Sequence, residues 1–297
     1  MSFDATAGRY LLGAAKLVTV NLQGRLERGE LPQAADKEGY APGREDITTD
    51  FDGLADEQYR SILEPTGYVL SEDSSEEADP SEVPDERYVI DAVDGTRSMN
   101  AGMYDKVGTM GAAVNGQHSY AAFVGALMTG EMIGFGADES SGQVSDYVID
   151  TTGKPIRRLL SLDHLDGQSA VSLPVQMRRS SRFSYSPHME RLVRPGVAFE
   201  GEQLVKGSFG LGMFPLFRGE VAAQVIPEYY FETPWDNTPV FAICKKLGIQ
   251  AFTFTDGGRL VPFGMEFIKA KRPGNEILLV HRAFAAEVVQ VAERLAP

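Results

Sequence analysis

The chain has 297 residues, of which 43% are hydrophobic, and its formal net charge is −14 at pH 7. This length suits one large domain or two compact halves that share an interface. Binding to a nucleic-acid duplex needs clustered Lys and Arg, so an acidic chain without a basic stripe is not expected to bind one. A small phosphorylated metabolite is compatible with this charge, because a bound cation can invert the local field.

Cys244 is the only cysteine, so neither a disulfide within the chain nor a cysteine-based zinc site is expected. Its apolar neighbours at 240–243 indicate a small core residue. The N-terminus lacks a basic segment followed by an apolar one, and no run of about 18 apolar residues occurs. The sequence therefore predicts a cytoplasmic protein without a membrane partner.

The first elements have helical patterns. Apolar residues at helical spacing predict a helix over residues 4–29, followed by a polar connection. The Thr-Thr-Asp run that ends at Asp50 is typical of a helix start, and apolar positions follow it up to residue 63. Asp50 has two interpretations, which are a helix cap that contributes about 1 kcal/mol and a carboxylate directed at a site.

A short strand is predicted at residues 67–70, and it ends in the acids Glu72 and Asp73. The stretch at 75–87 is rich in Glu, Asp, Ser and Pro, a composition typical of a solvated loop. We assign the acids of that stretch to the loop and not to a metal site.

Residues 88–90 predict a second buried strand, and Asp91, Asp94, Gly95 and Thr96 follow it. Gly95 frees the backbone, and Thr96 is a natural residue for a helix start. Carboxylates beside a turn with exposed N–H groups can hold a hard divalent cation and the phosphate that the cation polarises. The same pattern also occurs in ordinary Asx-turns that close a strand. Other parts of the chain are therefore needed to distinguish a cation site from a structural turn.

The pattern of expected strands and helices after residue 96 divides the chain into two halves. Residues 108–149 predict a meander of antiparallel strands, because their connections are too short for crossover helices. We expect an N-terminal half, residues 1–153, and a C-terminal α/β half, residues 154–297, with at least partly parallel strands. The later strands are expected at 169–173, 220–226, 251–254 and 276–280, and the later helices at 186–193, 209–217, 240–247 and 282–295.

Acidic residues recur where strands end or helices begin, which is where α/β folds place ligands. Mg²⁺ prefers oxygen ligands, so Glu72, Asp91, Asp94 and Asp236 together are able to hold two such ions. Four unrelated surface acids in an acidic protein would show the same spacing.

The motifs and their order resemble those of the inositol monophosphatase-like superfamily. Its members are Mg²⁺-dependent, lithium-sensitive phosphatases that include fructose-1,6-bisphosphatases and bisphosphate nucleotidases. The resemblance covers nearly the whole chain. The motifs that carry it are Thr49-Asp50, Glu72-Asp73, Asp91-x-x-Asp94-Gly95-Thr96, Gly207-Ser208 and Trp235-Asp236.

The resemblance implies an alternating α/β/α/β/α sandwich of the α+β or α/β class. The first sheet would be antiparallel, and the second would be mostly parallel. It also implies two or three bound Mg²⁺ ions and a homodimer.

The resemblance further implies metal ligands. Glu72, Asp91 and the backbone carbonyl of Val93 would ligate the first Mg²⁺. Asp91, Asp94 and Asp236 would ligate the second, and a third, weaker ion would lie near Glu72.

Catalytic and substrate roles follow from the same resemblance. Thr96 and Glu72 would position and activate the water, and Asp50 would hydrogen-bond Thr96 from behind. Gly95 and Thr96 would present backbone N–H groups to the phosphate. The substrate would also contact Gly207, Ser208, Asp236 and Glu228. Glu228 with its neighbours Tyr229 and Glu232 is equally compatible with an exposed loop.

The departures from the family pattern leave the substrate open; they are Asp73, Ala92, Met99 and Thr238-Pro239. We expect a Mg²⁺-dependent phosphomonoesterase of a small phosphorylated alcohol, an inositol or sugar phosphate. The alternatives are a 3′(2′),5′-bisphosphate nucleotidase, a fructose-1,6-bisphosphatase, or a non-catalytic relative that binds metabolites or partners. Arg178, Arg179 and Arg182 are either contacts for a second phosphate or a solvated basic stretch.

Overall fold

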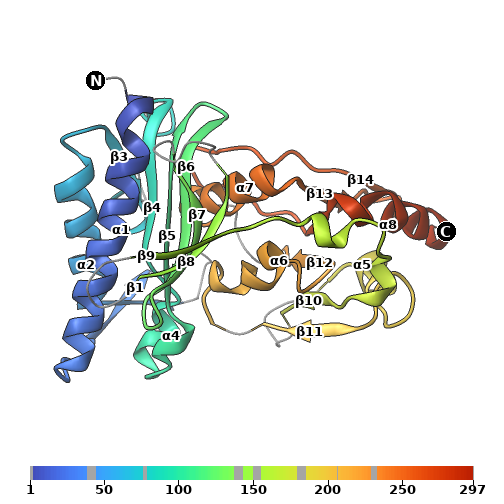
Figure 1. Cartoon of the computed structure of the whole chain (residues 1–297), viewed down its shortest axis with the longest axis horizontal. Coiled ribbons are helices and arrows are strands. Elements are labelled where there is room, and N and C mark those ends of the chain that lie inside the picture. The colour runs from blue at the N-terminus through green and yellow to red at the C-terminus, as the bar shows by residue number, and fades with distance from the viewer. Residues whose placement is uncertain are drawn as a thin grey trace.

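The computed structural model describes residues 3–38, 45–75, 79–136, 143–149, 155–178, 185–205, 207–228 and 233–296. These residues form alternating layers of helices and sheets (Figure 1). Helices α1 (Phe3–Glu27) and α2 (Asp50–Leu63) cover the first sheet, and α6 (Phe214–Arg218) and α7 (Pro234–Leu247) lie between the two sheets. Helices α5 (Pro187–Leu192) and α8 (Arg282–Leu295) cover the second sheet. The predicted layered fold is confirmed.

The first sheet has the strand order β3-β4-β5-β6-β7-β8-β9. β3 and β4 are parallel, and all later neighbours are antiparallel, which confirms the predicted meander. Its strands are β3 (Tyr68–Ser71), β4 (Glu86–Asp94), β5 (Gly108–Asn115), β6 (His118–Ala126), β7 (Glu131–Phe135), β8 (Ser145–Ile149) and β9 (Pro155–Leu159).

The second sheet has the order β11-β10-β12-β15-β13-β14. The expected parallel pairing holds only where β10 lies between β11 and β12; the other three pairs are antiparallel. A short turn joins β13 to β14, and a turn of that length permits only an antiparallel neighbour. The strands are β10 (Val175–Met177), β11 (Glu202–Leu204), β12 (Ala223–Ile226), β13 (Ile249–Phe254), β14 (Leu260–Pro262) and β15 (Ile277–His281).

The shorter elements lie at the edges of these layers. β1 (Ala34–Glu38) and β2 (Glu45–Thr49) form a separate antiparallel pair before α2. The short helices are α3 (Glu72–Ser75) and α4 (Thr96–Asn100), and the 3₁₀ turns are η1 (Tyr104–Lys106), η2 (Asp163–Leu165), η3 (Ala170–Ser172) and η4 (Leu211–Met213).

The strand expected at 169–173 is wrong, because this stretch forms the turn η3. The carboxylate of Glu287 in α8 accepts hydrogen bonds from the Ser169 hydroxyl and the Ala170 N–H. This contact with a distant helix overrides the local strand preference, and β10 begins only at Val175.

Helix α7 starts earlier than the sequence pattern suggested. It begins at Pro234 instead of residue 240, so Trp235 and Asp236 lie in its first turn. Pro239 lies within the helix, and Cys244 is fully buried in it. The early start positions Asp236 against the first sheet.

The expected boundary at residue 153 falls between β8 and β9, so the first sheet extends past it to Leu159. Helix α7 from the second half packs on β4, β5 and β6 of the first sheet. No helix in the ranges described is both long and apolar enough to cross a membrane.

His281, at the end of β15, is a buried titratable group with a consequence for stability. Its side chain is 1% exposed, and its ring packs edge-on against Phe284. Desolvation lowers its pKa to about 4, and His164 adds to this effect, while nearby backbone groups of Leu216 and Val221 offset part of it. The folded chain therefore resists protonation that the unfolded chain accepts.

Acidification should therefore destabilise the fold through His281. As the pH falls below the ordinary histidine pKa of about 6.5, the unfolded chain takes up a proton that the folded chain refuses. We expect His281 to cost about 2 kcal/mol of unfolding free energy between pH 7 and pH 5. In denaturant titrations, His281→Phe should lose less stability over this interval than the wild type. The exposed His118→Gln should match the wild type, and equal pH slopes for all three chains would contradict the assignment.

Candidate active site

Parallel pairing of β3 and β4 brings their carboxylates to one edge of the first sheet. Ser71 pairs with Ile90, so Glu72 follows β3 where Asp91 continues β4. The β4–β5 register is irregular between Asp91 and Asp94. This irregularity turns the end of β4 away from regular pairing. The neighbouring strands therefore place three carboxylates close together, as the sequence predicted.

Asp91 is buried at the centre of these acids. Its side chain is 3% exposed. Desolvation raises the pKa of Asp91 well above its usual value, and the charges of Glu72, Asp94 and Asp236 raise it further, in that order. These acids come from three separate elements, so the structure gathers them around Asp91.

Asp236 joins this group from the first turn of α7. Thr233 caps the helix, because its hydroxyl accepts the Asp236 N–H at 3.2 Å and donates to Asp236 Oδ2 at 2.6 Å. Desolvation, followed by the charges of Asp94 and Glu72, raises the pKa of Asp236 to about 8. The Thr233 hydrogen bond and the charge of Arg178 oppose this rise.

Asp94 is held by the turn at Gly207 and Ser208. Its Oδ1 accepts the Phe209 N–H at 2.9 Å, and its Oδ2 accepts the Gly210 N–H at 2.6 Å. The Ser208 hydroxyl also donates to Oδ2. Gly207 has a φ of +90°, a left-handed conformation that favours glycine. The turn thus fixes both oxygens of Asp94, while substrate contacts by Gly207 and Ser208 stay predictions.

Gly95 and Thr96 follow Asp94 at the start of α4. Gly95 has a φ of +96°, and a Cβ there would approach Ser208 N to 3.2 Å. The Thr96 hydroxyl lies 2.7 Å from Asp52 Oδ1 and 3.2 Å from the Val93 carbonyl oxygen. The shorter of these contacts directs the threonine proton to Asp52.

Asp52, and not Asp50, is the partner of Thr96. Asp50 is exposed, and its carboxylate accepts the Gln33 N–H at 2.7 Å, so the prediction that it hydrogen-bonds Thr96 is wrong. The two acids differ by about 200° around α2, so only one can face β4. Asp52 also forms a capping box with Thr49, a Thr-x-x-Asp signal that is visible in the sequence.

Asp52 is buried, with 5% of its surface exposed. Desolvation raises the pKa of Asp52 to about 6, against the opposing hydrogen bonds from Thr49 and Thr96. The nearby charge of Asp73 contributes to the rise. A carboxylate with this pKa can accept a proton near neutral pH.

The remaining predicted contacts have mixed outcomes. Glu228 is exposed, whereas Tyr229, Glu232, Arg179 and Arg182 lie outside the described residues. Arg178 is buried and donates to two backbone carbonyls, so it is not part of a solvated basic stretch.

The gathered acids suit a hard cation by their chemistry. As placed, no three His, Cys, Asp or Glu side chains within the described ranges form a ready metal cage. The donors at the site are nevertheless carboxylate oxygens, which Mg²⁺ prefers. Desolvation, followed by repulsion from the neighbouring acids, raises the pKa of Asp91 and of Asp236, and a bound cation would stabilise their ionised forms.

The chain resembles solved structures in fold and not in sequence. No family model and no curated protein matches it. An inositol monophosphatase (IMPase)/NADP phosphatase complexed with NADP and Ca²⁺ matches at a TM-score of 0.67 and 14% identity, covering 98% of this chain and 96% of that one. A dual specific IMPase/NADP phosphatase bound with D-inositol-1-phosphate gives the same four values.

The IMPase of Thermotoga maritima matches at a TM-score of 0.64 and 17% identity, covering 97% of both chains. These matches cover nearly the whole length of this chain and of each matched protein. The chain therefore has the fold of the inositol monophosphatases.

Proposed function

We propose that this chain is a Mg²⁺-dependent phosphomonoesterase that hydrolyses a small phosphorylated alcohol. The observation that carries the proposal is the convergence of Glu72, Asp91, Asp94 and Asp236 beside the Thr96–Asp52 pair. The fold supports it, because the similar structures include an IMPase/NADP phosphatase complexed with Mg²⁺ and phosphate.

The acids divide into two overlapping sets of ligands. Glu72, Asp91 and the Val93 carbonyl would hold one Mg²⁺, and Asp91, Asp94 and Asp236 would hold another. A third ion near Glu72 is part of the proposal. Bound Mg²⁺ lowers the pKa of a water molecule and neutralises charge in an in-line displacement.

Thr96 and Asp52 provide a path for the proton of the attacking water. Because the Thr96 hydroxyl donates to Asp52, its oxygen is free to accept a hydrogen bond from water. The proton moves from water to Thr96 while the threonine proton moves to Asp52. Glu72 would hold the same water from the other side. Gly95 and Thr96 would present backbone N–H groups to the phosphate.

The substrate class rests on the similar structures and on Arg178. Three of the similar structures are bound with D-inositol-1-phosphate, NADP and 2′AMP, respectively. A role for Arg178 in binding the second phosphate of a bisphosphate nucleotide is not favoured, because its guanidinium bonds the Gly207 and Ser208 carbonyls. We therefore favour a monophosphate and assign the inositol or sugar ring to the side of Glu228. The homodimer and the cytoplasmic location stay predictions.

A phosphate-release panel tests the reaction. The panel contains inositol 1-phosphate, fructose 1,6-bisphosphate, adenosine 3′,5′-bisphosphate and NADP, each with and without Mg²⁺. We expect Mg²⁺-dependent release to be fastest with inositol 1-phosphate or another monophosphate, and we expect lithium to inhibit it. Preference for adenosine 3′,5′-bisphosphate would favour the nucleotidase. No release from any compound would favour the non-catalytic relative.

Removing single charges from the acidic cluster should lower turnover strongly without unfolding the chain. Asp94→Asn and Asp236→Asn each remove a proposed ligand while keeping side-chain volume, and Asp236→Asn also relieves repulsion. We expect Mg²⁺-dependent phosphate release to fall by about 10² or more, with melting temperature maintained or raised for Asp236→Asn. Thermal unfolding measured beside activity separates the two effects, and unchanged release in both variants would exclude this cluster.

Asp50 and Asp52 form a matched pair for testing the proton path. Asp52→Asn removes the proton acceptor and should lower kcat by about 10²-fold, whereas the exposed Asp50→Asn should change kcat less than about 2-fold. In the wild type, protonation of Asp52 should reduce kcat as the pH falls below about 6. Full activity of Asp52→Asn, or equal losses in both variants, would contradict the assignment.

A further inference from the structure

We infer that Arg178 is a positioning residue that holds the turn at residues 207–210 against Asp94 and thereby sets how tightly the site binds Mg²⁺. This inference rests on the proposed function. It concerns a side chain that directly follows β10, whereas Asp91 and Asp94 both belong to β4 of the other sheet.

Arg178 forms a clamp on two successive carbonyls. Its Nη1 donates to the Gly207 carbonyl at 2.9 Å, and its Nη2 donates to the Ser208 carbonyl at 2.7 Å. The side chain is only 8% exposed. The rigid, planar guanidinium restricts the orientation of both peptide groups at once, which a lysine ammonium cannot do.

The backbone of Arg178 is itself fixed. The Tyr185 hydroxyl donates to the Arg178 carbonyl at 2.6 Å and lies 3.1 Å from the Arg178 N–H, which donates to it. The backbone of Arg178 is therefore hydrogen-bonded to Tyr185, and its guanidinium is hydrogen-bonded to the turn.

The turn transmits this constraint to Asp94. The peptide groups that Arg178 orients lead directly to the Ser208 hydroxyl and to the N–H groups of Phe209 and Gly210, the donors on Asp94. The contact is tight, because a Cβ at Gly210 would lie 3.1 Å from Asp94 Oδ2. A rotation of the turn would therefore rotate the carboxylate that the second cation needs.

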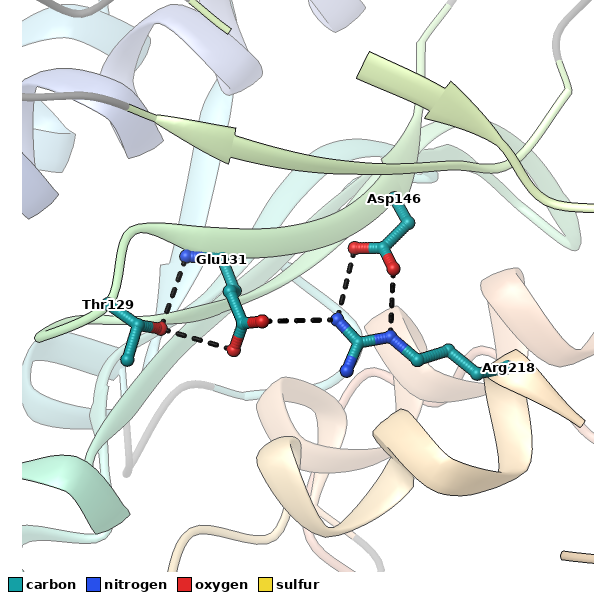
Figure 2. Close-up of polar contacts among 4 residues, drawn as sticks. All are labelled: Thr129, Glu131, Asp146 and Arg218. Carbon is teal, nitrogen blue, oxygen red and sulfur yellow. Dashed lines mark hydrogen bonds and ion pairs between the residues drawn. The ribbon is translucent and has the colours of Figure 1, made fainter. Parts of the chain in front are cut away.

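The far end of the same segment has a separate anchor. Figure 2 shows Arg218, at the end of α6, paired with Asp146 in β8 and Glu131 in β7. Its Nε and Nη2 donate to the two oxygens of Asp146 at 2.8 and 3.1 Å. Arg218 thus fixes α6 on the first sheet through carboxylates, whereas Arg178 acts on the turn through carbonyls. Arg218 is therefore a matched control.

The test compares Arg178→Gln and Arg178→Lys with Arg218→Gln. Mg²⁺ binding is measured by isothermal titration calorimetry, and the Mg²⁺ concentration for half-maximal phosphate release is measured in parallel. Because residues that orient metal ligands typically control affinity by 10–100-fold, we expect Arg178→Gln to weaken Mg²⁺ binding by about 10-fold or more. Arg178→Lys should recover part of this loss. Arg218→Gln should lower the melting temperature while changing Mg²⁺ affinity less than about 2-fold.

The outcomes separate this inference from the proposed function. Absence of both Mg²⁺ binding and phosphate release in the wild type would overturn the proposed function and this role of Arg178 with it. A wild type that binds Mg²⁺ and releases phosphate, beside a folded Arg178→Gln with the same affinity, would overturn the role of Arg178 alone. An equal loss of Mg²⁺ affinity in Arg218→Gln would also overturn it, because any destabilisation of the segment between residues 207 and 218 would then weaken Mg²⁺ binding. If Arg178→Gln does not fold, Ser208→Ala is measured instead, because it removes the hydrogen bond from the turn to Asp94. An unchanged Mg²⁺ affinity of Ser208→Ala would then overturn the inference.

Discussion

The burial of mutually repelling carboxylates at one edge of the first sheet is the constraint on which the site depends. The parallel pairing of β3 and β4 and the early start of α7 bring these acids together. The pKa of Asp236 rises to about 8, so this carboxyl is largely protonated near neutral pH unless positive charge compensates it. The available compensation comes from the Thr233 hydroxyl, the N–H groups on Asp94 and the charge of Arg178. A divalent cation would complete it.

Binding of the proposed cation would be coupled to folding. An acid whose folded pKa is raised destabilises the folded chain as the pH rises above its unfolded pKa, because the unfolded chain then ionises freely. For Asp236 this penalty grows from about pH 4 to about pH 8. A cation that binds only the folded chain offsets the penalty by mass action. His281 acts in the opposite direction, since its lowered pKa weakens the fold on acidification. Asp236 and His281 are therefore expected to have opposite effects on the pH dependence of the free energy of unfolding.

The fold and the central acids could be predicted from the sequence because their signals are local. Asp91 and Asp94 follow an apolar run directly, and parallel strands bring such ends together. The prediction that Asp50 hydrogen-bonds Thr96 failed because a difference of two residues at a helix start changes the side that faces the sheet, and Asp52 takes that position. The turn η3 depends on Glu287 in the last helix, and the clamp by Arg178 joins residues about thirty positions apart. Contacts between residues so far apart in the sequence produce no periodic pattern from which they could be predicted.

The departures from the family pattern lie mostly in the packing around the acids. Ala92 and Met99 are buried in the apolar cluster that also contains α1 and α2 residues, and Thr238 and Pro239 are buried within α7. Met99 Sδ lies 3.7 Å from the Thr49 hydroxyl, which also bonds Asp52. Met99 therefore affects the proposed proton acceptor Asp52 through Thr49, and not the carboxylates around Asp91. Changes of this kind alter the environment of the proposed proton acceptor while the set of proposed cation ligands stays intact, which fits a fold kept at low sequence identity.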